Sequence, residues 1–165
     1  MEDSTISLVI AIAAFILALF SLLNKHKPQQ TADESFASKP LRLQAYERLV
    51  LLCERISFPS LISRVSLPGV SAREMQMLLI ESIKQEYEYN VTQQVYVSTL
   101  AWDAVRNLRD QTMLIINQVA NMLPPNATSA DLNKQLLEVI LGQQDKALHT
   151  IVLDTLTQEA KRVMQ

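Results

Sequence analysis

The feature that most constrains this chain is an apolar run, ISLVIAIAAFILALFSLL, at residues 6–23. Ser7 and Ser21 are its only polar members, so a helix built from it has no polar face. At 1.5 Å per residue such a helix spans roughly 27 Å, close to the hydrocarbon thickness of a bilayer. The run therefore predicts a transmembrane helix that contacts the lipid bilayer through residues 6–23.

A cleaved signal peptide is the alternative interpretation of the same run. A signal peptide needs a positively charged segment before the apolar run and a small-x-small cleavage site after it. The first five residues are Met-Glu-Asp-Ser-Thr, and no such site precedes Asn24. The sequence favours an uncleaved anchor.

The charges on either side of the run predict its orientation. Lys25 and Lys27 follow it, whereas Glu2 and Asp3 precede it. The positive-inside rule places the lysine side in the cytoplasm. We therefore expect a single-pass protein of the inner (cytoplasmic) membrane, with its N-terminus outside and its C-terminal domain in the cytoplasm.

Composition divides the chain into three parts. Residues 1–24 form the anchor with a short N-terminus, and residues 25–39 are polar, small and charged without an apolar period, which is typical of a flexible linker. Residues 40–165 carry repeated apolar positions three or four residues apart, which predicts helices. We expect these residues to form a cytoplasmic helical domain.

The predicted fold class is all-α, a compact bundle of four main helices plus one or two short ones. Two glycines and 5% aromatic residues fit this prediction. Pro40 suits the first turn of the first helix, and the segment with Pro59, Pro68 and Gly69 reads as a turn-rich connector. Ser71 and Glu74 have the spacing of a capping box, as do Thr128 and Asp131, although Ser129 is an alternative cap.

Two of the later helices have clear apolar stripes. One stripe runs from Ala101 to Met122 in steps of four and three residues, over three heptads, as in a coiled-coil seam. Neighbouring apolar residues widen this stripe into the kind of face that is buried in a helical bundle. The other lies on the last helix, about 144–164. The predicted buried positions are Ala101, Val105, Leu108, Thr112, Ile115, Val119 and Met122, and then Leu148, Ile151, Val152, Thr155, Leu156 and Val163.

The first helix carries the pair Glu-Arg twice, seven residues apart, at 47–48 and 54–55. None of the four charges has an opposite charge three or four residues away, the spacing at which helical neighbours pair. Leu51 lies within their arc. We expect Glu47, Arg48, Glu54 and Arg55 to be less exposed than ordinary surface charges, with at least one arginine meeting a carboxylate of another helix or chain. A solvated charged face is the alternative.

Residues that could carry out catalysis or bind a cofactor are sparse. Neither His26 nor His149 has a second ligand at metal-binding spacing, and Cys53 lies on an apolar stripe, so we expect no metal site, no cofactor and no catalytic residue. Glu81, Glu86 and Glu88 fit a solvated ion-pair face better than acid–base catalysis. Apart from two acids before the apolar run, the chain has 15 acidic and 15 basic residues, so there is no basic surplus for nucleic acid.

Three stretches, PLRLQAYERLVLLCERI, EYEYNVTQQVYVSTLAWDAV and LPPNATSADL, resemble a small uncharacterised bacterial family of single-pass membrane proteins with a cytoplasmic helical domain. The resemblance implies the topology and the domain boundaries but no activity. Together with the Glu-Arg pairs it suggests a candidate interaction surface: Arg42, Gln44, Tyr46, Glu47, Arg48, Glu54, Arg55, Gln93, Gln94, Tyr96 and Trp102.

The sequence therefore predicts a non-enzymatic, membrane-anchored scaffold or adaptor whose helical domain binds a protein partner or self-associates. A membrane-peripheral sensor that binds a lipid or small apolar ligand between helices is the alternative. An enzyme of unrecognised class is the least favoured hypothesis, and His149 beside a carboxylate in a cleft would revive it.

Overall fold

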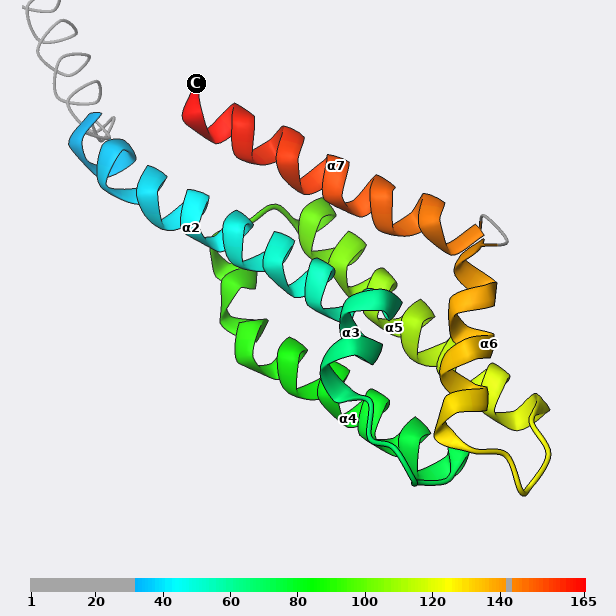
Figure 1. Ribbon diagram of the computed structural model, residues 1–165. Helices are drawn as coiled ribbons and strands as arrows, with labels where there is room; N and C mark the ends of the chain where they lie inside the picture. Colours follow the sequence, from blue (N-terminus) through cyan, green and yellow to red (C-terminus); the bar gives the residue numbers. More distant parts are fainter. Residues whose placement is uncertain (1–31, 142–143) are drawn as a thin grey trace, which may run out of the picture. The chain divides into compact units, whose positions relative to one another are not determined.

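The computed structural model describes residues 32–141 and 144–165 as helices and short connections (Figure 1). The chain divides into two units between Ala37 and Ser38, and the second unit is the bundle considered below. No helix within the described ranges is long and apolar enough to cross a membrane. The predicted transmembrane helix, residues 6–23, lies outside these ranges.

The described part of the chain contains six α-helices and one 3₁₀ helix, and no strand. This confirms the all-α prediction. The α-helices are α2 (Ala32–Ile56), α3 (Phe58–Val65), α4 (Ala72–Asn90), α5 (Thr99–Met122), α6 (Ser129–Leu141) and α7 (Gln144–Met164), and the 3₁₀ helix is η1 (Val91–Val95).

Helices α4 and α5 each pack against three or more other α-helices of the bundle. They are joined by η1 and pack against each other, while α3 and α6 pack against α4, and α6 and α7 pack against α5 (Figure 1). Leu49, Met75, Leu79, Val105 and Leu132 are fully buried in one continuous core. Apolar residues of α2, α3 and α7 complete that core, which fixes α2 beside α4.

The starts of α4 and α6 are capped as predicted, and they lie side by side. The Ser71 side chain accepts from the Glu74 amide, and the Glu74 carboxylate accepts from the Ser71 amide at 2.9 Å. Thr128 and Asp131 repeat this arrangement. Ser71 and Thr128 also form an antiparallel bridge, so the two capped helix starts are tied together.

Two predicted boundaries are wrong. Helix α2 begins at Ala32 and runs through Pro40 instead of starting there. The predicted connector after the first helix contains α3, whose first turn holds Pro59. Pro59 suits that position because the first amides of a helix have no partner within the helix, and the spacing of Phe58, Leu61 and Ile62 supplies a buried face.

Two of the predicted core positions are exposed. Met122 lies at the end of the three-heptad stripe and is 82% exposed, because an α-helix drifts by roughly 20° per heptad from an exact seven-residue repeat. Ile116, which lies outside the predicted stripe on the same helix, is fully buried, whereas Ile115 is only partly buried. Helix α7 buries Val152 and Leu156 in a narrow stripe, which leaves Ile151 exposed.

Candidate docking surface on α2 and α4

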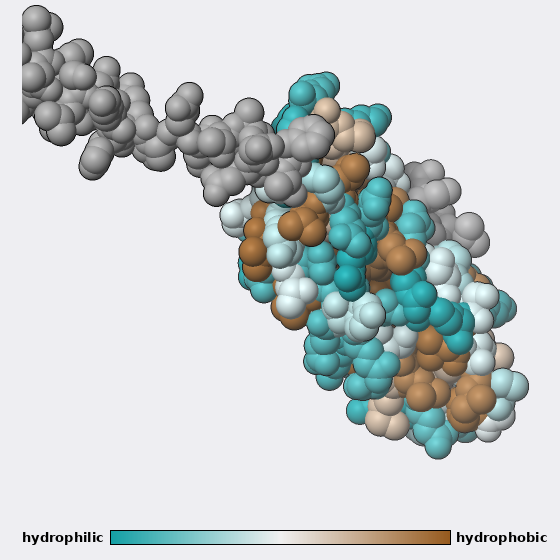
Figure 2. All heavy atoms as spheres, turned by 90° about the vertical axis from the view of Figure 1, so that its left-hand side faces the viewer, coloured by the Kyte–Doolittle hydropathy of each residue, from teal (hydrophilic) through white to brown (hydrophobic). Residues whose placement is uncertain are grey.

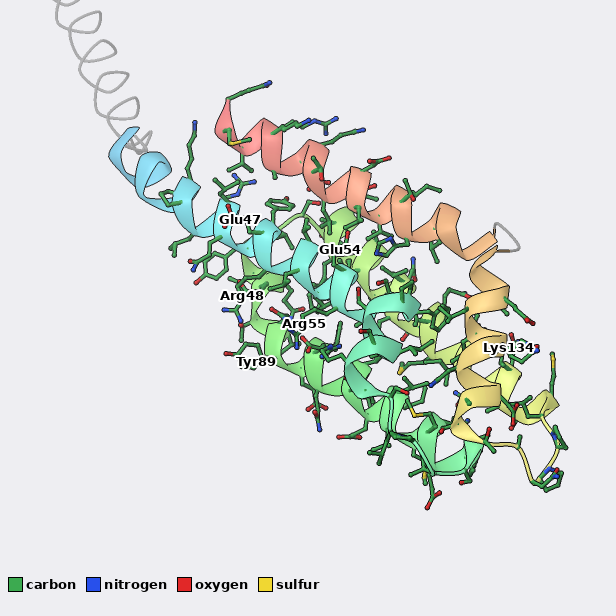
Figure 3. The ribbon with its side chains drawn as sticks, in the orientation of Figure 1. Glu47, Arg48, Glu54, Arg55, Tyr89 and Lys134 are labelled. Carbon is green, nitrogen blue, oxygen red and sulfur yellow. The ribbon has the colours of Figure 1, made fainter. Side chains whose placement is uncertain are left out.

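The charges of the two Glu-Arg pairs separate onto opposite edges of α2. Figure 3 shows Glu47 and Glu54 on the edge nearer α7, and Arg48 and Arg55 on the edge nearer α4. This separation follows from the helix period, since adjacent residues point about 100° apart. Leu51 lies between the two edges and is 57% exposed.

Arg55 pairs with a carboxylate of another helix, as predicted. Its Nε and Nη2 both donate to Oε1 of Glu86 on α4, at 2.7 and 2.6 Å. Arg64 of α3 donates to the same oxygen at 2.8 Å and to the backbone carbonyl of Arg55 at 2.9 Å. The hydrogen bond that Arg55 donates to Glu86 raises the pKa of the Arg55 guanidinium. Glu86 therefore joins α2, α3 and α4.

Arg48 has a different environment from Arg55. Its Nε donates to Oδ1 of Asn90 at 3.3 Å, and its guanidinium carbon lies 5.3 Å from the centroid of the Tyr89 ring. The side-chain amide of Asn90 donates in turn to the backbone carbonyl of Glu86 at 2.8 Å, which fixes the orientation of the Asn90 side chain. Within the described ranges, Arg48 has no ion pair and no hydrogen-bond acceptor for Nη1 or Nη2.

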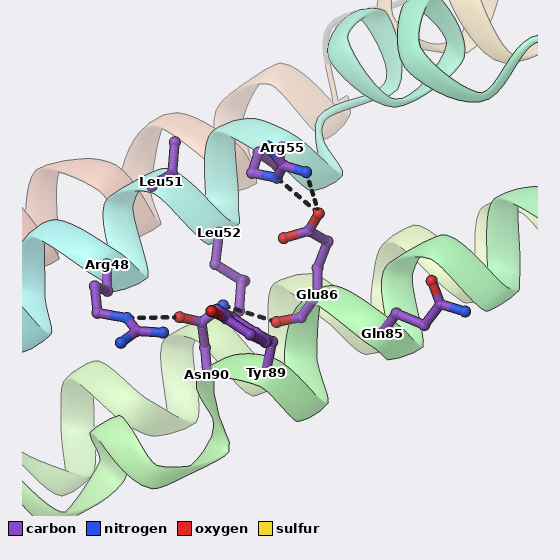
Figure 4. A pocket seen from close by; sticks show the side chains of 8 residues that line it. All are labelled: Arg48, Leu51, Leu52, Arg55, Gln85, Glu86, Tyr89 and Asn90. Atoms are coloured by element: carbon purple, nitrogen blue, oxygen red, sulfur yellow. Dashed lines mark hydrogen bonds and ion pairs between the residues drawn. The ribbon is translucent and has the colours of Figure 1, made fainter.

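A groove of about 570 Å³ runs between α2 and α4 (Figure 4). Both arginines line it, and so does Tyr89, which is 77% exposed. The groove combines apolar surface with guanidinium groups, a composition typical of protein-interaction sites. We call it the α2–α4 groove, lined by Arg48, Leu51, Leu52, Arg55, Gln85, Glu86, Tyr89 and Asn90.

The prediction of reduced exposure is wrong for the two glutamates. Glu47 and Glu54 are exposed, and no side chain among the residues that the structure describes forms an ion pair with either. The arginines are half-buried because their stems lie against α4.

The structure separates the other residues of the sequence-predicted surface into two groups. Arg42, Gln44, Gln94 and Tyr96 are exposed, whereas Tyr46, Gln93 and Trp102 are buried. The Tyr46 hydroxyl donates to Glu159 of α7 at 2.6 Å and accepts from the Ser98 amide, and burial raises the pKa of its phenol. Trp102 packs against Tyr87 with ring centroids 5.3 Å apart. These buried residues hold the bundle together.

The residues on the α4 side of the groove were not among the residues predicted from the sequence. Tyr89 and Asn90 are the last two residues of the run EYEYN, and the mixture of tyrosines and carboxylates in that run was the only sequence signal for a surface there. Figure 2, viewed from the left-hand side of Figure 1, shows hydrophobic residues in several patches among hydrophilic ones on the bundle. Exposed apolar area on this face is therefore discontinuous.

A second pocket of about 330 Å³ lies where α2, α3, α5 and α7 meet. Its wall is mainly apolar, with Phe58, Leu108 and Leu148 among its residues. His149 and Glu54 also line it, and the buried Nε2 of His149 has no hydrogen-bond partner among the residues described.

The only cysteine, Cys53, is buried, and burial with the neighbouring Glu54 charge raises the pKa of its thiol to about 12. Within residues 32–141 and 144–165, no group of three histidine, cysteine or carboxylate side chains could hold a metal ion.

Comparison with protein families gives one match that covers almost the whole chain. A family of unknown function, DUF7935, matches residues 3–163. The chain belongs to this family. The DUF7935 match includes the predicted apolar run, the α2–α4 groove and all residues of the helices described above except the last residue of α7. No curated protein and no solved structure matches the chain.

Proposed function

We propose that this protein is a non-enzymatic, membrane-anchored adaptor whose helical bundle holds a protein partner at the cytoplasmic face of the membrane. The anchor is the apolar run of residues 6–23, oriented by Lys25 and Lys27. The proposal includes that the protein is bacterial and that its anchor lies in the inner (cytoplasmic) membrane. The bundle supplies the docking surface.

One observation supports the adaptor function most directly. On α2, an exposed leucine lies between two charged edges, and next to it the α2–α4 groove presents an exposed tyrosine under a guanidinium. Tyrosine and arginine are enriched among residues that dominate binding energy at interfaces. Leu51 and Tyr89 together expose apolar area that a partner would cover.

Affinity purification of the full-length chain from crosslinked membranes tests the proposal. A Leu51→Ser/Tyr89→Ser variant should lose the copurifying protein, whether this is a different protein or a second copy. Leu100→Ser is the matched control, since Leu100 is 67% exposed on α5 and lies outside the groove. A chain that fractionates away from membranes contradicts the anchor, and a partner retained equally by both variants contradicts the docking surface.

A sensor that binds a small apolar ligand is a second candidate function, and the His149 pocket favours it. Its volume of about 330 Å³ falls at the low end of the range of small-molecule pockets, about 300–1,000 Å³. The unpartnered Nε2 of His149 would hydrogen-bond a polar group on such a ligand. Native mass spectrometry of the detergent-extracted chain should then show an added mass that Leu108→Trp removes by filling the pocket. A bare chain contradicts this candidate.

A further inference from the structure

We propose that two copies of this chain associate in parallel through the outer face of α2, with Leu51 of one copy against Leu51 of the other. This inference rests on the proposed docking surface, and it names a second copy of the chain as the partner. The main evidence is that the charged edges of α2 are complementary to those of a second α2 only when the two helices run parallel.

The outer face of α2 has three parallel stripes. Viewed down the axis, Glu47 and Glu54 lie about 40–60° to one side of Leu51, and Arg48 and Arg55 lie about 40–60° to the other. Gln44, also exposed, lies about 20° from the central line. The face therefore has an acidic edge, a centre that holds Gln44 and Leu51, and a basic edge.

This order of stripes distinguishes parallel from antiparallel pairing. In a parallel pair, the two-fold axis runs along the helices and places the acidic edge of each copy against the basic edge of the other. In an antiparallel pair, the axis runs across the helices and places acidic against acidic and basic against basic. Because like charges at an interface suppress pairing, α2 is complementary to itself only in the parallel orientation.

The carboxylates and guanidinium groups that would form ion pairs between the two copies are accessible on this face. Glu47 and Glu54 are exposed, and the structure gives neither of them an ion pair within the described ranges. Arg48 has both Nη atoms without an acceptor there, and the Arg55 side chain remains 42% exposed although it is paired. Glutamates of a second copy would supply the missing acceptors.

The proposed anchor independently favours the same orientation. Two chains inserted in one bilayer with the same topology leave the membrane on the same side, which favours a parallel approach of their α2 helices. Exposed ion pairs contribute little individually, so the isolated contact is weak. Tethering in a membrane raises the effective concentration of one copy for the other.

Disulfide crosslinking of the full-length chain in liposomes tests both the contact and its direction. Leu51→Cys should form a disulfide-linked dimer on mild oxidation, whereas wild type should not, since its only cysteine is buried. Gln44→Cys should also crosslink, because residues of equal number face each other in a parallel pair. Leu100→Cys, exposed but outside the face, should give at least about fivefold less dimer.

The pattern of crosslinks decides the outcome. If Leu51→Cys crosslinks but Gln44→Cys does not, the pair is antiparallel and the inference is wrong. If both give no more dimer than Leu100→Cys, a second copy is not the partner. Loss of a different copurifying protein from Leu51→Ser/Tyr89→Ser would then leave the adaptor proposal intact.

Charge reversal tests the complementarity itself. In the Leu51→Cys background, Glu47→Lys should reduce the dimer at least about fivefold, and so should Arg48→Glu, because each variant brings like charges together. Mixing the two variants should restore a crosslinked heterodimer, since the introduced lysine then faces the introduced glutamate. Arg55 is left unchanged because it holds Glu86. Equal dimer yields in all three samples would overturn the proposal.

Discussion

Arg55 of α2 donates two hydrogen bonds to a single oxygen of Glu86 on α4, at 2.7 and 2.6 Å. Arg64 of α3 donates to the same oxygen, so one carboxylate serves three helices. The Glu86 side chain is 16% exposed and that of Arg55 is 42% exposed, which places this cluster between a buried and a solvated ion pair.

Glu86→Gln should therefore lower the free energy of unfolding by about 1–2 kcal/mol, less than the loss of a partner from a fully buried pair and more than that from an exposed pair. Urea unfolding of the full-length chain in mild detergent measures the change. Arg106→Gln is the control, since Arg106 pairs with Asp103 at the surface and its loss should cost about 0–1 kcal/mol. Equal effects would mean that the Glu86 cluster is as solvated as the surface pair.

Tyr46→Phe should loosen the contact between α2 and α7. The substitution removes the hydrogen bond to Glu159 and leaves the Ser98 amide without its phenolic acceptor, at a cost of about 1–2 kcal/mol. Hydrogen exchange should become faster in the last turns of α7, around residues 156–163. Tyr96→Phe, at an exposed phenol, should leave exchange unchanged. Unchanged exchange in Tyr46→Phe would show that apolar packing alone holds α7.

Acidification should weaken the two capped helix starts. Hydrogen bonds from the backbone and side chains of Ser71 and Thr128 lower the pKa of Glu74 and Asp131. A carboxyl whose pKa is lower in the folded state stabilises the fold above its unfolded pKa, about 4, and loses that contribution as pH falls through the folded value.

The melting temperature of wild type should therefore exceed that of Ser71→Ala/Thr128→Ala at pH 7, and the difference should shrink below about pH 4. Thermal unfolding followed by circular dichroism from pH 7 to pH 2.5 measures it. A difference that stays constant over this range would mean that the two carboxyl groups contribute nothing through their ionised form.

Cys53 should not react with thiol reagents while the bundle is folded. Burial raises its pKa to about 12, so the reactive thiolate is scarce at pH 8, and the sulfur is enclosed. Labelling by a maleimide, read by mass spectrometry, should begin only at urea concentrations that unfold the bundle. Labelling in the absence of urea would mean that α2 detaches from the core under native conditions.

Local sequence signals predicted the fold well where the interaction itself is local. The capping boxes at Ser71 and Thr128 each join residues three apart, so residue type and spacing were sufficient. Helix α3 was missed because proline and glycine around it outweighed a short apolar period. The exposure of Met122 reflects a helical drift that a strict heptad pattern does not contain.

The candidate site could be predicted only in part. The Glu-Arg pairs marked α2 as unusual and indicated an interhelical partner, but Glu86 lies 31 residues from Arg55 and any of several carboxylates could have filled that role. The α2–α4 groove exists only because the core places Tyr89 beside Arg48. Such a juxtaposition depends on tertiary packing, which residue spacing along one helix does not contain.

The bridge between Ser71 and Thr128 has a consequence for how the chain folds. The Ala72 amide donates to the Ala127 carbonyl at 2.9 Å, and the Ser129 amide donates to the Val70 carbonyl at 3.0 Å. These bonds close residues 71–128 into a loop that contains α4, η1 and α5. A segment that joins its own ends and buries its own helix–helix contact fits a cooperative folding unit. We expect it to form early in folding, with α2, α3 and α7 docking afterwards on a preassembled hairpin.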